Sequence, residues 1–259
     1  MPARNPAASP PRRARPPRAA GAAPRPWLVF DLDGVLVDVN GSYRRAIVET
    51  VQHFGGGRPQ AAEVQAIKNL GGYNNDWDVT RELLRRRGLA VGYRELVAAF
   101  DRYYLGAGFP RRARGLIRRE RWLLDPRLLA RLRRRYRLAI FTGRPRAQAD
   151  YVLRRFRKLS AFRPLVGHED VRRGKPHPEG LRRLGRLCAP APIAAYIGDT
   201  VDDARCAAAA GIPFYGILPQ DHSTPAAMRR LFRGCGCRAI MPDINAVARA
   251  LLNQEPASP

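Results

Sequence analysis

The chain has 259 residues, 45% of them hydrophobic, which suits one large domain or two modest ones. It carries 47 basic and 22 acidic residues, a net charge of +25, and because only three of the basic residues are lysine, 44 are arginine. The arginines are scattered, without zinc-finger spacing or a helix-turn-helix pattern, so we expect nonspecific polyanion binding at low salt and no specific nucleic-acid partner. No apolar run reaches the roughly 18 residues of a membrane span, so no membrane partner is expected.

Residues 1–26 are rich in Pro, Ala and Arg and contain no acid, a composition typical of a disordered basic tail. They lack the apolar stretch of a signal peptide, and an organelle transit peptide is the alternative. The cysteines are sparse, which favours a reducing, cytoplasmic location. Cys235 and Cys237 are too close for ordinary zinc spacing, and a redox or metal role is the alternative there.

The first predicted strand is the apolar run Trp27–Phe30, and two acids separated by one residue follow it, Asp31 and Asp33. Two carboxylates so close repel each other unless a cation offsets their charge, and oxygen ligands at this density suit Mg²⁺. Gly34 lets the backbone turn sharply, so that both acids can face one point. Taken alone, the same residues are also compatible with an acidic turn that closes a strand.

Residues 41–121 have a helical pattern that no strand signal interrupts. The expected helices are Ser42–Phe54, with Ser42 as its cap, then Ala61–Asn69, Thr80–Arg87 and Tyr93–Tyr104. A crossover between parallel strands needs only about a dozen residues. The excess predicts an inserted helical subdomain that begins just after the acid pair and lies over it.

After this insert, short apolar runs and helical stretches alternate. The strand-like runs are Leu138–Phe141, Ala194–Ile197, Pro213–Leu218 and Arg238–Met241, and the helical stretches are Leu128–Arg135, Ala147–Lys158, Pro178–Leu187 and Asp202–Ala210. The alternation predicts an α/β fold with a doubly wound parallel sheet. Ligands bind at the carboxyl ends of the strands in such sheets, and the polar motifs of the chain fall there.

Three further motifs follow predicted strands. The hydroxyl of Thr142 and the backbone beside Gly143 can donate to a phosphoryl oxygen. Lys175 stands before a proline and a helix, where it can place a compact positive charge on a phosphate, although a surface-loop lysine is the plain alternative. Asp199 and Asp203 add a second acidic cluster for Mg²⁺, in which Asp203 would hold water ligands or orient Lys175.

The ordered set of Asp-x-Asp-Gly, Thr, Lys-Pro and Gly-Asp-x-x-x-Asp, each after an apolar strand, resembles the haloacid dehalogenase (HAD) superfamily of phosphotransferases. The resemblance runs from about Trp27 to the end of the chain, and the helical insert looks like the cap of subfamily IA, as in phosphoglycolate phosphatase-like enzymes. Beyond the basic tail at 1–26, it implies a Rossmann-like HAD core at 27–40 and 122–259 and a helical cap at 41–121.

The resemblance also implies a role for each motif. Asp31 would attack phosphorus to form an aspartyl-phosphate, and Asp33 would protonate the leaving oxygen and then deprotonate the hydrolytic water. The expected Mg²⁺ ligands are Asp31, the backbone carbonyl of Asp33, and Asp199, with Asp203 supporting the site. Thr142 and Lys175 would neutralise the transferring oxygens. Dehalogenases of this superfamily need no acid at the position of Asp33, so its presence favours phosphate esters.

Substrate choice is expected to come from the cap. The turn Lys68–Asp78 is unusually polar and Gly-rich, and we expect it to dip into the active site, the alternative being a hydrogen-bonded loop with Trp77 packed in the cap core. Arg44 or its neighbour near the hinge can meet a substrate carboxylate. The substrate-binding candidates are Arg45, Asn74, Asn75 and Gly143.

The sequence therefore predicts a Mg²⁺-dependent cytoplasmic phosphatase that acts on a small phosphorylated metabolite. One alternative is a sugar-phosphate mutase on the same fold. The other is a non-catalytic nucleic-acid-associated protein, which would have no need of Asp31 and Asp33 together. No motif indicates the substrate or the oligomeric state.

Overall fold

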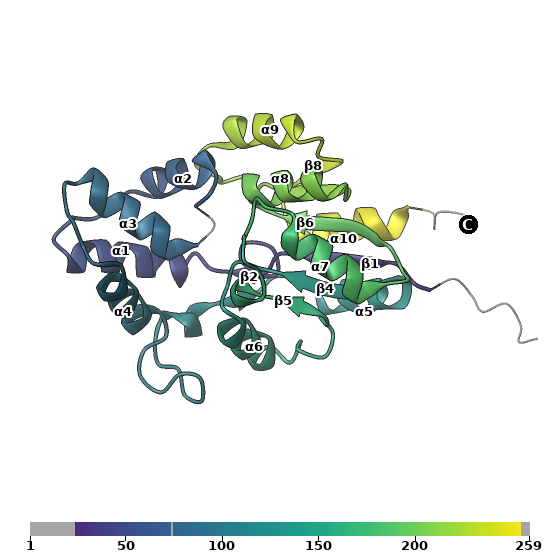
Figure 1. The fold of residues 1–259 in the computed structure, drawn as a ribbon. Helices are drawn as coiled ribbons and strands as arrows, with labels where there is room; N and C mark the ends of the chain where they lie inside the picture. The colour runs from purple at the N-terminus through teal and green to yellow at the C-terminus, as the bar shows by residue number, and fades with distance from the viewer. Residues whose placement is uncertain (1–23, 74, 255–259) are drawn as a thin grey trace, which may run out of the picture.

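The computed structural model describes residues 24–73 and 75–254, and its centre is a six-stranded parallel sheet (Figure 1). In spatial order the strands are β5 (Leu165–Val166), β4 (Arg137–Phe141), β1 (Trp27–Phe30), β6 (Ile193–Gly198), β7 (Phe214–Ile217) and β8 (Ala239–Met241). β1 lies between β4 and β6, with Leu28 opposite Leu138 on one side and Ala195 on the other. The predicted doubly wound α/β fold is confirmed, and the acid pair follows an inner strand.

Helices cover both faces of this sheet because its inner strands are apolar on both sides. Along β1, Leu28 and Phe30 belong to the hydrophobic core formed with α5 (Pro126–Arg135), α6 (Arg146–Arg155) and α10 (Ile244–Asn253). Trp27 and Val29 point to the opposite face, into the core formed with α7 (Glu179–Cys188), α8 (Val201–Ala210) and α9 (Pro225–Gly234). The alternation of side chains along a strand therefore explains both layers.

Four helices between β1 and β4 form a second group beside the sheet (Figure 1): α1 (Tyr43–His53), α2 (Ala61–Leu70), α3 (Asp76–Arg86) and α4 (Tyr93–Tyr104). α1 packs against both α3 and α4. The chain enters this group after β2 (Val37–Asp38) and leaves it through β3 (Arg121–Trp122), and these two strands pair antiparallel. We call residues 41–121 the helical insert and the β2–β3 pair the hinge ladder.

The predicted elements differ from the observed ones in a few places. α3 begins at Asp76, before its predicted start, because the side chain of Asn75 accepts a capping hydrogen bond from the backbone N–H of Asp78. Ser42 stands at the N-cap of α1, but its hydroxyl donates to Glu120 and makes no capping bond. The sequence does not predict β2, β3 or β5, since strands of two residues carry no periodic signal.

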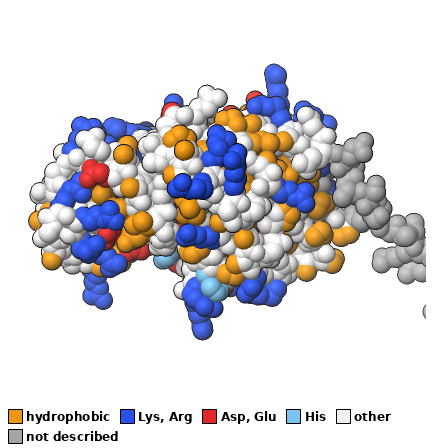
Figure 2. All heavy atoms as spheres, turned by 90° about the horizontal axis from the view of Figure 1, so that it is seen from above, with side chains coloured by type: hydrophobic (Ala, Val, Ile, Leu, Met, Phe, Trp, Pro, Cys, Tyr) orange, Lys and Arg blue, Asp and Glu red, His pale blue; other side chains and the backbone are white. Residues whose placement is uncertain are grey.

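Basic side chains are spread over the surface. On the face seen in Figure 2, Lys and Arg lie in small separate groups between apolar and neutral polar side chains. Within the described residues, every helix is too short or too polar to cross a membrane. All four cysteines are free thiols. Of the predicted tail, only residues 24–26 lie within the described part of the chain.

Candidate active site

The turn after β1 brings its two carboxylates to the carboxyl end of the sheet. The backbone N–H groups of Leu36 and Val37 both donate to the carbonyl of Leu32 at 2.9 Å, which closes the turn. Gly34 has a φ of +73°, in the left-handed region that favours glycine. A Cβ at Gly34 would lie 1.9 Å from Oδ2 of Asp199, so the position also requires glycine for space.

A buried lysine bridges two buried acids in this site. Nζ of Lys175 lies 2.9 Å from Oδ1 of Asp31 and 2.7 Å from Oδ1 of Asp203. All three residues are buried, and an isolated charge at such a place would be strongly unfavourable, so the three groups neutralise one another. Burial, opposed by Lys175 and reinforced by the charge of Asp203, raises the pKa of Asp31 to about 7. A further positive charge beside Asp31 would therefore favour its carboxylate form.

Asp203 is engaged by groups on every side. Its Oδ1 accepts from the hydroxyl of Tyr196 at 2.5 Å and forms an ion pair with Nζ of Lys175 at 2.7 Å. Its Oδ2 accepts from the backbone N–H and the hydroxyl of Thr200, at 3.1 and 2.6 Å, in the capping box that begins α8. Of the two roles expected for Asp203, these contacts favour the orientation of Lys175.

Three carboxylates converge as a metal site requires. Asp31, Asp199 and Asp203 offer oxygens within 4.8 Å of one another. Oδ1 of Asp199 is buried with no hydrogen-bond partner in the described part of the chain, and burial followed by the charges of Asp31 and Asp203 raises the pKa of Asp199. Hard oxygen donors with surplus negative charge fit Mg²⁺. Because Asp203 is already bonded on both oxygens, Asp31 and Asp199 are the better placed ligands.

Thr142 and Gly143 directly follow β4, the strand beside β1. The backbone N–H of Thr142 donates to the carbonyl of Val166 at 3.0 Å, which fixes its position in the sheet. Its hydroxyl accepts from the backbone N–H of Arg144 at 3.2 Å, so the hydroxyl proton can be given to a ligand. Both residues line the same cavity as Asp31, as expected for phosphate-binding groups.

Arg144 is a site residue that the sequence alone does not reveal. Its Nε donates to Oδ2 of Asp33 at 3.2 Å, and its Nη2 donates to the other oxygen of the same carboxylate. Its Nη1 and Nη2 each lie 3.1 Å from an oxygen of Glu120, a second residue that no sequence motif predicts. Among 44 arginines, only its place directly after the Thr142-Gly143 motif distinguishes this one.

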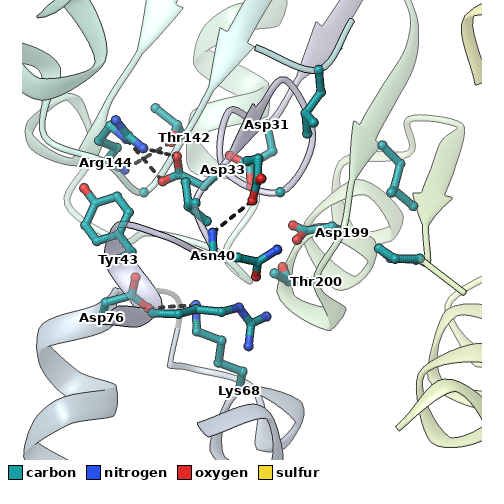
Figure 3. A pocket seen from close by; sticks show the side chains of 18 of the residues that line it. Asp31, Asp33, Asn40, Tyr43, Lys68, Asp76, Thr142, Arg144, Asp199 and Thr200 are labelled. Atoms are coloured by element: carbon teal, nitrogen blue, oxygen red, sulfur yellow. Dashed lines mark hydrogen bonds and ion pairs between the residues drawn. The ribbon is translucent and has the colours of Figure 1, made fainter. Parts of the chain in front are cut away.

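A cavity of about 460 Å³ lies between the carboxyl end of the sheet and the helical insert. Figure 3 shows Asp31, Asp33 and Asp199 on its core side and Lys68 and Asp76 on the side of the insert. Among the hydrogen bonds that join the insert to the core near this cavity, two come from the end of α2 and the turn after it. The backbone N–H of Gly72 donates to the carboxylate of Asp202 at 2.9 Å, and Nδ2 of Asn69 donates to the hydroxyl of Thr224 at 2.9 Å.

The prediction that Arg45 binds substrate needs correction. Arg45 is exposed and pairs with Glu49 at 2.5 Å, away from the cavity. Successive residues of a helix point about 100° apart, so Arg44 and Arg45 face different directions. Arg44 lines the cavity, and its Nη2 donates to Oε1 of Gln65 at 3.0 Å.

The turn at residues 68–78 does reach the cavity, but its side chains have other partners. Asn75 lines the cavity while it caps α3 and donates from Nδ2 to Oδ2 of Asp78 at 2.6 Å. Asn74 lies outside the described residues. Nζ of Lys68 lies 2.7 Å from Oδ1 of Asp76. Packing of Trp77 in the cap was the alternative to a turn that dips into the site, and Trp77 both lines the cavity and packs edge-on against Phe100 in the insert.

Comparison with known proteins gives a consistent family. A family model described as haloacid dehalogenase-like hydrolase matches residues 27–211. A phosphoglycolate phosphatase of Cupriavidus necator is 31% identical over 196 residues, which are 72% of this chain and 78% of that protein. An imidazoleglycerol-phosphate dehydratase of Phytophthora nicotianae is 34% identical over 234 residues, 85% of this chain and 51% of that protein. The chain therefore spans about half the length of this second relative.

Solved structures show the same fold. A protein of Bacteroides fragilis described as a haloacid dehalogenase-like hydrolase has a TM-score of 0.66 and 21% identity, with 86% of this chain and 100% of that chain covered. A protein of Thermotoga maritima described as a β-phosphoglucomutase has a TM-score of 0.61 and 20% identity, with 87% and 98% covered.

Proposed function

Because this chain belongs to the haloacid dehalogenase-like hydrolases and is an enzyme of their phosphatase type, we propose that it hydrolyses a small phosphomonoester through an aspartyl-phosphate on Asp31. One observation carries the proposal. Asp31 stands at the end of an inner strand, 2.9 Å from the buried ammonium of Lys175, and lines a cavity that the helical insert covers. A carboxylate, a fixed cation and a covered cavity are what nucleophilic attack on a phosphate ester needs.

The residues of the site divide the reaction between them. Asp31 attacks phosphorus, the bond from phosphorus to the leaving oxygen breaks, and Asp33 gives that oxygen a proton. In the second half, Asp33 takes a proton from the water that attacks the aspartyl-phosphate, which releases phosphate and restores Asp31. Lys175 offsets the charge of the transferring oxygens and Thr142 donates a hydrogen bond to them, which is supported by the burial of both residues and by the 2.9 Å between Lys175 and Asp31.

Mg²⁺ is the proposed cofactor. Asp31, Asp199 and the backbone carbonyl of Asp33 would hold it, and when bound it would offset the repulsion between the nucleophilic carboxylate and the phosphate dianion. The buried Oδ1 of Asp199, without a partner among the described residues, supports this assignment. The carboxylate of Asp33 then stays available for proton transfer.

The cavity favours a small substrate with a second negative charge. Arg44 lines the cavity, and in the described structure its guanidinium is hydrogen-bonded to the neutral amide of Gln65. Its charge can therefore pair with an anion of the substrate, and Gly143 and Asn75 line the same cavity. A carboxylated ester such as phosphoglycolate, the substrate named for the Cupriavidus necator relative, meets this requirement. Imidazoleglycerol phosphate, named for the Phytophthora nicotianae relative, is the second ester to test.

A sugar-phosphate mutase is the second candidate. A mutase must keep water from its phosphorylated enzyme, and the contact of Gly72 with Asp202 closes the insert on the core in the way that such shielding needs. The neighbour described as a β-phosphoglucomutase has the same fold, and hydrolase and mutase share the chemistry of their first half-reaction.

A panel of phosphomonoesters tests the proposal. The purified protein is incubated with phosphoglycolate, imidazoleglycerol phosphate and hexose phosphates, with Mg²⁺ or with EDTA, and both phosphate release and sugar isomers are measured. Phosphate release that requires Mg²⁺ is the expected result. Conversion of one sugar phosphate into another without phosphate release would support the mutase, and the absence of turnover of every ester would refute the enzyme assignment.

A further inference from the structure

A fully buried arginine connects the proposed acid–base residue to a second carboxylate. The side chains of Arg144 and Glu120 are both 0% exposed, whereas that of Asp33 is 27% exposed. The guanidinium donates to both oxygens of Asp33 and to both oxygens of Glu120. A planar guanidinium can pair with both oxygens of each of two carboxylates at once, whereas the compact ammonium of a lysine offers no such paired, planar set of donors.

Glu120 ties this arginine to both ends of the helical insert. It directly precedes the hinge strand β3, and its Oε1 accepts from the hydroxyl of Ser42 at 3.0 Å, where the first helix of the insert begins. The same oxygen accepts from the hydroxyl of Tyr104, the last residue of α4, at 2.8 Å. A movement of the insert about the hinge ladder would therefore move Glu120.

The plane of the guanidinium is also restricted. The ring of Tyr43 lies over it, with 4.8 Å between the ring centroid and the central carbon of Arg144, and the ring of Tyr104 stacks on that of Tyr43 at 4.1 Å. A buried cluster of two acids and one arginine is often no more stabilising than well-packed apolar residues. A contribution to stability alone therefore does not explain this cluster, whereas a role in fixing the orientation of the Asp33 carboxylate does.

Resting on the proposed function, we propose that Arg144 and Glu120 are positioning residues that set the orientation of Asp33 and connect it to the hinge ladder. In the structure both oxygens of Asp33 contact Arg144, so the carboxylate must turn or release one contact to reach a leaving oxygen. Glu120 shares the guanidinium and thereby limits how tightly Arg144 holds Asp33. Without Glu120 as a second acceptor, Arg144 would hold Asp33 too tightly or in the wrong orientation, and proton transfer to the leaving group would be slower.

The leaving group of the substrate provides the test. An alkyl phosphate needs a proton on its leaving oxygen, whereas p-nitrophenolate leaves without one. The value of kcat/KM covers the steps up to departure of the leaving group, so it isolates the acid role of Asp33. For Glu120→Gln, which keeps an acceptor for Ser42 and Tyr104, we expect kcat/KM to fall about 10-fold or more for the best alkyl ester of the panel and less than about 3-fold for p-nitrophenyl phosphate.

Two further variants complete the experiment. Glu82→Gln makes the same change in a carboxylate that bonds Arg85 and Arg86 on α3, and it should leave both rates unchanged. Arg144→Lys keeps the buried positive charge but loses the planar guanidinium, so kcat/KM should again fall more for the alkyl ester than for p-nitrophenyl phosphate. This variant provides the test if the Glu120→Gln protein does not fold. If the wild-type enzyme is active and the substitutions change kcat/KM equally for the alkyl ester and for p-nitrophenyl phosphate, the positioning role is wrong. A wild-type protein without phosphatase activity would instead overturn the proposed function.

Discussion

Nζ of Lys175 lies 2.9 Å from Oδ1 of Asp31, so the proposed nucleophile is already held by a buried cation in the protein itself. The same nitrogen lies 2.7 Å from Asp203, which is fixed in turn by the cap of α8. The geometry of the nucleophile thus depends on three segments at once: the end of β1, the first turn of α8, which carries Asp203, and the loop before α7, which carries Lys175. A substitution in any of the three should therefore alter the position of the Asp31 carboxylate.

Replacement of Lys175 by methionine should destabilise the protein and abolish its activity. The change leaves Asp31 and Asp203 buried without their cation, which typically costs about 3–5 kcal/mol in the free energy of unfolding. Mg²⁺ should restore part of this loss, because the freed carboxylates bind it more tightly than before. Urea denaturation with and without Mg²⁺ measures both effects. Lys158→Met, at a half-buried lysine 5.9 Å from the ring of Trp122, is the control and should cost less than about 1 kcal/mol. A Lys175→Met protein as stable as the control would contradict this role for Lys175.

The stability of the metal-free protein should fall as the pH rises from about 4 to 7. Burial raises the pKa of Asp31 from 3.8 to about 7, and it also raises that of Asp199. Over this interval the folded state binds more protons than the unfolded state, so a rise in pH favours unfolding. Mg²⁺ replaces the protons, and its stabilising effect should be larger at pH 8 than at pH 5. Thermal melts at the two pH values, with Mg²⁺ or with EDTA, measure it, and a metal-free protein that gains stability over the same interval would refute the prediction.

Gly34→Ala should disable the site through Asp199. The new Cβ would lie 1.9 Å from Oδ2 of Asp199, so that carboxylate must move, and the left-handed backbone adds a penalty of about 1–2 kcal/mol. Gly55→Ala is the matched control, since Gly55 has a φ of +79° and a Cβ there would meet no atom within 4 Å. We expect similar losses of backbone stability in both variants, but a loss of Mg²⁺ affinity and turnover of at least about 10-fold only in Gly34→Ala. Titration of Mg²⁺ against activity compares them, and equal Mg²⁺ dependence in both would show that Asp199 does not need this space.

Two neighbouring arginines on α1 test the substrate site. Arg44→Ala should lower kcat/KM for a carboxylated ester by about 10-fold or more, because a charge-assisted contact of this kind typically contributes about 1.5–3 kcal/mol. Arg45→Ala should remain close to wild type, since Arg45 is an exposed partner of Glu49. For p-nitrophenyl phosphate, which has no carboxylate, both variants should behave alike. A larger loss in Arg45→Ala than in Arg44→Ala would reverse the assignment.

The sequence predicted the sheet and its polar strand ends because these are local patterns. Trp27–Phe30 is a continuous apolar run that the structure makes β1 without change, and the acids after it fall at the carboxyl end as expected of a parallel sheet. Local patterns could not predict the two-residue strands of the hinge ladder, since only the pairing of β2 with β3 defines them. Their absence from the prediction also concealed the position of Glu120 beside them.

Side-chain direction in the helical insert could not be predicted in the same way. Arg44 and Arg45 are chemically identical in the sequence, and the rotation of α1 against α3 and α4 decides which one faces the cavity. Asn75 was a candidate for substrate contact, yet its side chain caps α3, a role that Asn fulfils equally well. Arg144 stood among 44 arginines, and only the three-dimensional structure brings it to Asp33.

The most direct test of the account is to trap the phosphorylated enzyme. The protein is mixed with its best substrate and Mg²⁺, quenched in acid within milliseconds to seconds, digested and analysed by mass spectrometry. We expect one phosphoryl group on the peptide that contains Asp31, sensitive to hydroxylamine and absent with EDTA, and no turnover by Asp31→Asn. Steady turnover by Asp31→Asn, with that peptide never phosphorylated in the wild-type enzyme, would contradict the account.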